Sequence, residues 1–131
     1  MEYALSIELD LPHEEAVVKV KEAFAAQGFG ILTEIDVQAT LKTKTGADIE
    51  PYLILGACNP QLAQQALEIE RQIGLLLPCN VVVRAGDGCT IVEALDANVI
   101  AEIPDRDELV PVAKEAGRLI RAALDSLTQQ P

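Results

Sequence analysis

The chain is poor in aromatic and in basic side chains. Its 131 residues include two Tyr, two Phe and no Trp, and ten Lys and Arg stand against 21 Asp and Glu, for a net charge of −11. Phosphate backbones and anionic membrane surfaces both attract clustered basic residues. The composition therefore argues against nucleic acid and against a membrane as partners. With so few aromatic residues, the core must be built from Leu, Ile, Val and Ala.

Long apolar runs are also missing, and the first residues do not have the pattern that predicts a leader segment. No apolar stretch approaches the roughly 20 residues of a membrane span. The start of the chain, residues 1–4, has neither the basic nor the apolar region of a signal peptide. We therefore expect a cytoplasmic protein. The length is typical of one domain, here residues 1–131, because single domains commonly have about 100–150 residues.

Metal-binding and disulfide patterns are absent from the sequence. Its three cysteines, Cys58, Cys79 and Cys89, form no CxxC pair, and His13 is the one histidine. An odd number of irregularly spaced cysteines is not a disulfide framework. One histidine leaves too few nitrogens for the mixed Cys/His zinc patterns. We expect neither a metal nor a cofactor, and composition alone indicates no particular reaction.

The first half of the chain alternates between extended and helical patterns. Apolar and polar residues alternate over residues 3–9, which predicts a half-buried strand. Pro12 suits the first turn of a helix that Gly28 ends. Residues 30–37 resume the extended pattern. A short charged stretch with a turn follows, at residues 42–48.

The middle of the chain predicts a buried strand followed by a helix. Residues 52–57 form a continuous apolar run, as in a strand that is covered on both faces. Asn59 and Pro60 then provide a helix N-cap and a proline at the first helical position. The apolar face of this helix extends to Ile73, and Gly74 ends it.

A hairpin and a long helix complete the predicted fold. Strands at residues 79–84 and 89–94 flank the turn at residues 86–88, which predicts antiparallel pairing. A helix from about residue 105 to 127 follows, and Pro111 in its first two turns allows the regular helix to begin only there. The predicted order is β-α-β-β-α-β-β-α. It indicates an α+β two-layer sandwich in which helices cover one face of a mainly antiparallel sheet.

Two Cys-Asn dipeptides contain the first candidate catalytic or ligand-binding residues. Cys58 stands between a strand and the Asn59 cap, and the partial positive charge of a helix N-terminus lowers a thiol pKa. We favour the alternative, in which Cys58 is a small apolar side chain and Asn59 only a cap. Cys79 and Asn80 stand at a strand entrance. If the two strands run so that their cysteine ends meet, the two Cys-Asn dipeptides would share one pocket. If the strands are parallel, these ends lie apart.

Two carboxylates form the second candidate. Glu34 and Asp36 lie two residues apart on a predicted strand, so they share one face. Such a pair can serve in acid–base catalysis, but it is more often part of a solvated sheet face, which we favour. We interpret His13 as a surface residue and Cys89 as a structural one.

Three motifs together resemble a known family. They are Gly28-Phe29-Gly30 with residues 33–37 (TEIDV), residues 55–60 (LGACNP) and residues 77–83 (LPCNVVV). In this order and spacing they are similar to the domain-of-unknown-function 302 family. The resemblance implies a TBP-like α+β fold with a curved antiparallel sheet, and small cytosolic proteins that often form homodimers. It implies no activity. The positions typical of the family are Gly28, Glu34, Asp36, Cys58, Asn59, Pro60, Pro78, Cys79 and Asn80.

The leading functional hypothesis is a homodimeric ligand-binding or interaction module without catalysis, which could take a small-molecule ligand. A two-layer sandwich often leaves one sheet face uncovered, and a partner, a ligand or a second subunit must then meet it. The alternative is a thiol-dependent enzyme or redox protein with Cys58 as nucleophile and Cys79 as its partner. The candidate ligand-binding residues are Cys58, Asn59, Cys79, Asn80, Glu34 and Asp36.

Overall fold

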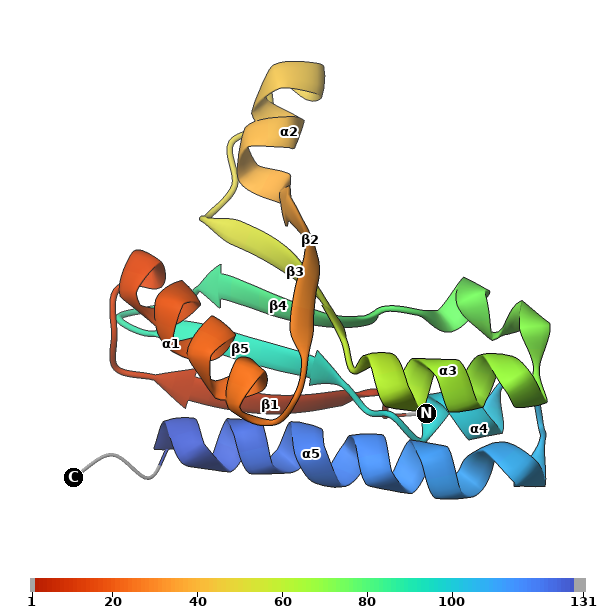
Figure 1. Ribbon diagram of the computed structural model, residues 1–131. Coiled ribbons are helices and arrows are strands. Elements are labelled where there is room, and N and C mark those ends of the chain that lie inside the picture. Colours follow the sequence, from red (N-terminus) through yellow and green to blue (C-terminus); the bar gives the residue numbers. More distant parts are fainter. Residues whose placement is uncertain (1, 129–131) are drawn as a thin grey trace.

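The computed structural model describes residues 2–128 and contains one open five-stranded sheet (Figure 1). The strand order is β1-β5-β4-β3-β2, and every neighbouring pair is antiparallel. The predicted antiparallel sheet is therefore confirmed. The strands are β1 (Ala4–Leu9), β2 (Gly30–Asp36), β3 (Tyr52–Cys58), β4 (Cys79–Ala85) and β5 (Thr90–Leu95).

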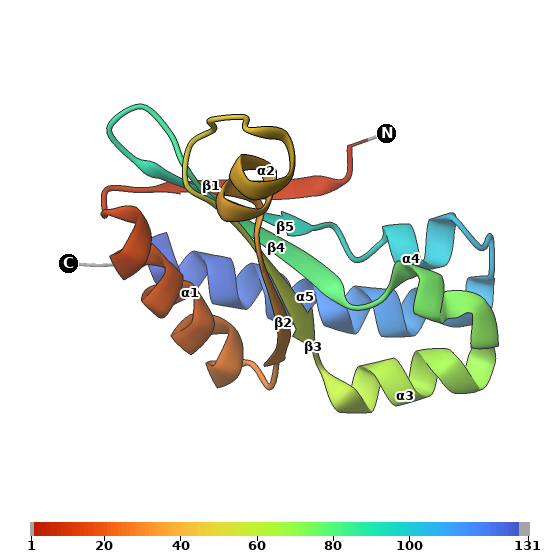
Figure 2. The ribbon, with the colours of Figure 1, turned by 90° about the horizontal axis from the view of Figure 1, so that it is seen from above.

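Helices form a second layer on one face of the sheet, which confirms the predicted α+β sandwich. The helices α1 and α5 pack against each other and against the strands, and α3 continues beyond the end of β3 (Figures 1 and 2). No helix within residues 2–128 is long and apolar enough to cross a membrane. The helices are α1 (His13–Ala26), α2 (Val37–Thr45), α3 (Pro60–Ile69), α4 (Val99–Glu102) and α5 (Val110–Thr128), with 3₁₀ helices at Arg71–Leu76 and Asp107–Leu109.

The core lies between these two layers and is mostly aliphatic. The two phenylalanines, Phe24 and Phe29, are both buried in it, and their rings meet edge to face with centroids 5.5 Å apart. The buried hydroxyl of Thr90 donates a hydrogen bond to the carbonyl oxygen of Leu11 at 2.8 Å. The strands bury alternate residues towards the helices, namely Leu55, Ala57, Cys79, Val81, Val83, Val92 and Ala94.

Within residues 2–128, no helix is packed over the centre of the opposite face of the sheet. Tyr52 is paired across the strands with Arg84, and Ile54 with Val82, and all four are only half-buried. Val82 in turn lies opposite Glu93, whose carboxylate accepts a hydrogen bond from Arg84 Nε at 2.9 Å. This uncovered face therefore combines apolar side chains with an ion pair.

The helix α2 is a feature that the sequence patterns did not predict. Residue 37 was expected in a strand and residues 42–48 in a charged turn, but the chain forms a helix that projects away from the α5 side (Figures 1 and 2). The carboxylate of Asp36 caps it by accepting from the Ala39 amide at 2.9 Å, and Gly46 ends it at φ 77°. The helix contains no buried residue. Without a buried face, it leaves no amphipathic pattern in the sequence.

One other helix boundary differs from the prediction, and the start of the last helix agrees with the alternative start at Pro111. The helix α3 ends at Ile69 rather than near Ile73, because Glu70 is extended and a separate 3₁₀ helix follows it. The last helix begins at Val110, so that Pro111 lies in its first turn, where its missing N–H is tolerated. The short helix α4 was not predicted either.

Close packing over Gly56 gives a first testable prediction. A Cβ at this position would collide with the side chain of Thr33 and would lie 2.9 Å from Cγ of Pro78. We expect Gly56→Ala to lower the free energy of unfolding by about 1–3 kcal/mol, as overpacking does. Urea denaturation measures this change.

The matched control is Gly74→Ala, because a Cβ at Gly74 would meet nothing within 4 Å. Adding Thr33→Ala to Gly56→Ala removes the nearest obstacle and should recover part of the lost stability. Equal stability of the Gly56→Ala and Gly74→Ala proteins would contradict this account of the packing.

Candidate functional site

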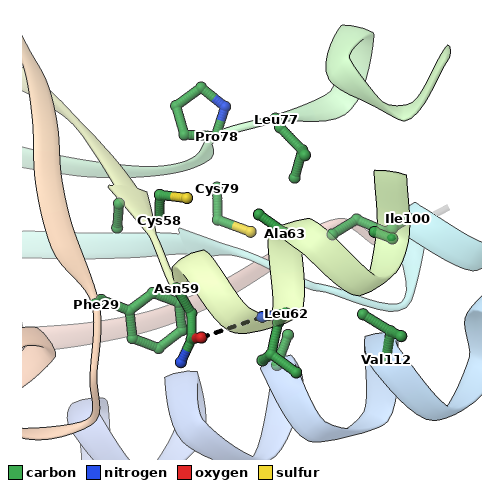
Figure 3. Close-up of a pocket in the computed structure, with 13 residues that line it drawn as sticks. Phe29, Cys58, Asn59, Leu62, Ala63, Leu77, Pro78, Cys79, Ile100 and Val112 are labelled. Carbon is green, nitrogen blue, oxygen red and sulfur yellow. Dashed lines mark hydrogen bonds between the residues drawn. The ribbon is translucent and has the colours of Figure 1, made fainter. Parts of the chain in front are cut away.

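The two cysteines of the motifs line one small cavity at the ends of β3 and β4 (Figure 3). Antiparallel pairing places Ala57 directly opposite Cys79, so Cys58, the next residue of β3, lies close to it. The cavity volume is about 30 Å³. It is lined by Phe29, Ala57, Cys58, Asn59, Leu62, Ala63, Ala66, Leu77, Pro78, Cys79, Ile100, Val112 and Ala116.

Both thiols are held in the protonated form. Burial raises the pKa of the half-buried Cys58 thiol, although this residue stands directly before a helix. The pKa of the Cys79 thiol is raised to about 11, first by burial and then by negative charge on Cys58. Apart from these thiols, the cavity lining contains no titratable side chain. The site therefore lacks both a ready thiolate and a base that could generate one.

Asn59 has a structural role at this cavity. Its Oδ1 accepts a hydrogen bond from the Leu62 amide at 3.2 Å, and Pro60 is the first residue of α3. This is the predicted N-cap. Its Nδ2 lies close to Gly28, where an added Cβ would be 3.2 Å away and the backbone has φ 85°. The glycine motif and the Cys-Asn-Pro motif therefore meet in space.

Asn80 lies away from the two cysteines. It is paired with Gly56 on the uncovered face of the sheet, and it is exposed. There it lines a hollow together with Tyr3, Tyr52 and Val82. The cysteine ends of the two strands meet, but the second asparagine does not reach the thiol cavity.

Glu34 and Asp36 also lie away from the thiol cavity. They are paired with Leu55 and Leu53 on the helix-facing side of the sheet, and both are exposed. Glu34 forms an ion pair with Lys21 of α1, and Asp36 caps α2. The two carboxylates thus share a face, as the spacing predicted, but each has its own structural partner.

Three other residues have contacts that the sequence did not indicate. His13 was interpreted as a surface residue, yet its Nε2 lies 2.9 Å from the carbonyl oxygen of Val83 and donates to it. Tyr3 and Tyr52 line the same hollow as Asn80. The sequence signal for the two tyrosines was their rarity. The chain has two Tyr and no Trp, and both tyrosines stand at the ends of predicted strands.

The pKa shifts predict slow alkylation of both cavity thiols. A raised pKa means little thiolate at neutral pH, so the iodoacetamide rate at Cys58 should rise about tenfold per pH unit up to at least pH 9. Cys79 is buried and should be modified only after unfolding. Peptide mass spectrometry follows each site separately.

Cys89, which is half-exposed and lies outside the cavity, serves as the internal reference for reagent access. A Cys58 rate that levels off below pH 8 would contradict the raised pKa and would favour the thiol-enzyme hypothesis instead.

Comparison with known proteins identifies the family. The family described as "Domain of unknown function DUF302" matches residues 5–127. No curated protein matches the chain. A crystal structure of an uncharacterized conserved DUF302 protein from Bacillus stearothermophilus is similar to it, with a TM-score of 0.88 and 26% sequence identity. The alignment covers 95% of this chain and 98% of that one. The family match spans most of the chain, and the protein belongs to the DUF302 family.

Proposed function

We propose that this protein is a homodimeric binding module that takes a small organic ligand and catalyses no reaction. The observation that carries the proposal is the uncovered face of the sheet, where a hollow contains both of the protein's tyrosines. An uncovered sheet face with apolar side chains is a surface that a ligand or a second subunit must meet.

The hollow has the size and the lining of a small-molecule site. Its volume is about 370 Å³, and ligand pockets commonly measure about 300–1,000 Å³. Tyr3 is 64% exposed, so its ring is free to make contacts. The lining residues come from β3, β4, β5 and the region of β1, namely Tyr3, Ala4, Tyr52, Asn80, Val82, Glu93, Ala94 and Leu95.

The lining also indicates the kind of ligand. Tyr3 and Tyr52 provide apolar ring surface together with hydroxyl groups, a combination that is enriched at binding surfaces. Asn80 provides an amide. The Glu93 carboxylate is already engaged by Arg84 at 2.9 Å and by the Ser6 hydroxyl at 3.3 Å, so its charge is largely balanced. A neutral molecule with an aromatic or apolar body and a few polar groups fits this lining best.

The extent of the same face supports assembly as a homodimer. Beyond the hollow it presents the half-buried Ile54, and Ile35 of β2, which is 49% exposed. A second copy would cover this apolar surface, and a face-to-face pair would also close the hollow from above. We therefore place the dimer contact on the sheet rather than on the helices.

The thiol-enzyme alternative has no observation in its favour. A nucleophilic cysteine needs a lowered pKa or a neighbouring base. Burial instead raises the pKa of both Cys58 and Cys79, and the cavity around them is apolar.

The assembly can be tested by sedimentation velocity at micromolar protein concentrations. We expect the wild type to sediment as a dimer. Ile54→Lys, which places a charge on the uncovered face, should give a folded monomer, because a buried unpaired charge is costly. The control is Val18→Lys on α1, where the native side chain is 54% exposed, and it should remain a dimer. A monomeric wild type would overturn the proposed assembly.

Ligand binding can be tested with the neutral apolar dye Nile red. Because the protein has no Trp, its tyrosine emission comes from Tyr3 and Tyr52 alone, and bound dye should quench it. Tyr52→Ala should weaken dye binding roughly tenfold or more, as for the loss of a central aromatic contact. Val18→Ala is the control. Equal dye binding by both variants would rule out the hollow as the site.

A further inference from the structure

We infer that a groove at one end of the molecule binds a basic amphipathic segment of a partner protein. The groove lies between the 3₁₀ helix Arg71–Leu76 and the residues that follow α4, at the end where α3 ends and α5 begins (Figures 1 and 2). It shares no residue with the tyrosine hollow, so this inference is independent of the proposed function. The apolar side chains that line it are Ile73, Leu75, Leu76, Ile103 and Pro104.

The groove exposes apolar side chains to solvent. Leu75 is 86% exposed, the largest value among the exposed large apolar residues of the described chain, and Ile103 is 55% exposed. Ile73, which lines the same groove, is buried in the core. Single exposed apolar side chains are ordinary on protein surfaces, whereas several around one groove form a contact surface.

The size of the groove favours an anchoring side chain over a whole organic ligand. Its volume is about 250 Å³, and small-molecule pockets commonly measure about 300–1,000 Å³. Protein partners commonly bind by inserting an apolar anchor into a pocket of this kind. We therefore expect the occupant to be part of a larger chain.

The surroundings of the groove are acidic. The two segments that form it, residues 68–76 and 102–108, contain six acidic and two basic residues. Glu102 and Asp105 stand on either side of two lining residues, and both are exposed. Neither has an ion-pair partner within the described part of the chain. Carboxylates beside an apolar groove attract Lys or Arg of a partner and repel an acidic one.

One of the two bases is already neutralised by carboxylates of this chain. The guanidinium of Arg106 forms ion pairs with Glu70 at 3.1 Å and with Glu108 at 2.8 Å. Because Glu70 directly precedes the 3₁₀ helix and Arg106 lies on the α4 side, these pairs also join the two walls of the groove. The other base, Arg71, is exposed and does not line the groove. A groove with fixed walls loses less conformational entropy on binding.

These features together select the class of partner. The carboxylates would repel anionic lipid headgroups and nucleic acid phosphates. This chain has only ten Lys and Arg, so a second copy offers little to match the carboxylates. An amphipathic helix with Lys or Arg beside its apolar face matches both the lining and the charge, and the binding of such a helix in a groove is a common mode of peptide recognition.

The test uses a fluorescein-labelled peptide of about twelve residues, with leucines at helical spacing and lysines between them. Fluorescence anisotropy follows its binding to the full chain. We expect saturable binding by the wild type. Binding should weaken severalfold when the ionic strength rises from about 0.01 M to about 1 M, because the Debye length falls from about 30 to about 3 Å. Leu75→Lys should weaken it about tenfold or more, because this variant removes an apolar contact and adds a positive charge.

The matched control is Leu32→Lys, which makes the same change at a 64% exposed leucine on β2, outside the groove. It should bind the peptide like the wild type, and a peptide with glutamates in place of the lysines should not bind. No binding of the lysine peptide by the wild type, equal binding by the two leucine variants, or equal binding of the glutamate peptide would overturn the inference. So would a wild-type dimer that Leu75→Lys disrupts and Leu32→Lys does not, because a second copy would then occupy the groove.

Discussion

The pairing of β3 with β4 is the interaction on which the rest of the structure depends. Its antiparallel register places Ala57 opposite Cys79 and Gly56 opposite Asn80. Cross-strand partners share a face, and successive residues alternate between faces. A slip of one residue would therefore exchange the buried and the exposed sets of side chains in this part of the sheet. In this register, Thr33 and Pro78 pack tightly over Gly56.

The residues of the two Cys-Asn motifs lie in two chemical environments. Cys58 and Cys79 reach a small apolar cavity against α3, where burial keeps the thiols protonated. Asn80 belongs to the other side, with Tyr3 and Tyr52 in a larger and more polar hollow. The open face provides area and aromatic contacts suited to an organic ligand, whereas the lining of the small cavity is apolar.

The elements that could be predicted from the sequence are those with one buried and one exposed face, or with a recognisable cap. The alternation of apolar and polar residues predicted β1. The Asn59 cap and Pro60 predicted the start of α3. The helix α2 has no buried residue, so it has no apolar stripe to detect. Among the site residues, Cys58 and Cys79 could be predicted to line one cavity only if their two strands were antiparallel, and the sequence did not determine the strand directions. The role of Glu34 was undetermined because its partner, Lys21, lies on another element.

The sequence by itself determined the aliphatic core, the α+β class, the family and the acidic charge. These properties follow from composition, periodicity and local caps, which act over a few residues. Only the tertiary structure decided that Cys58 and Cys79 share a cavity, that Asn80 does not, and that Tyr3 and Tyr52 meet in one hollow. The physical reason is that strand order and register arise from packing between distant segments. No local pattern records which two strand ends will be neighbours.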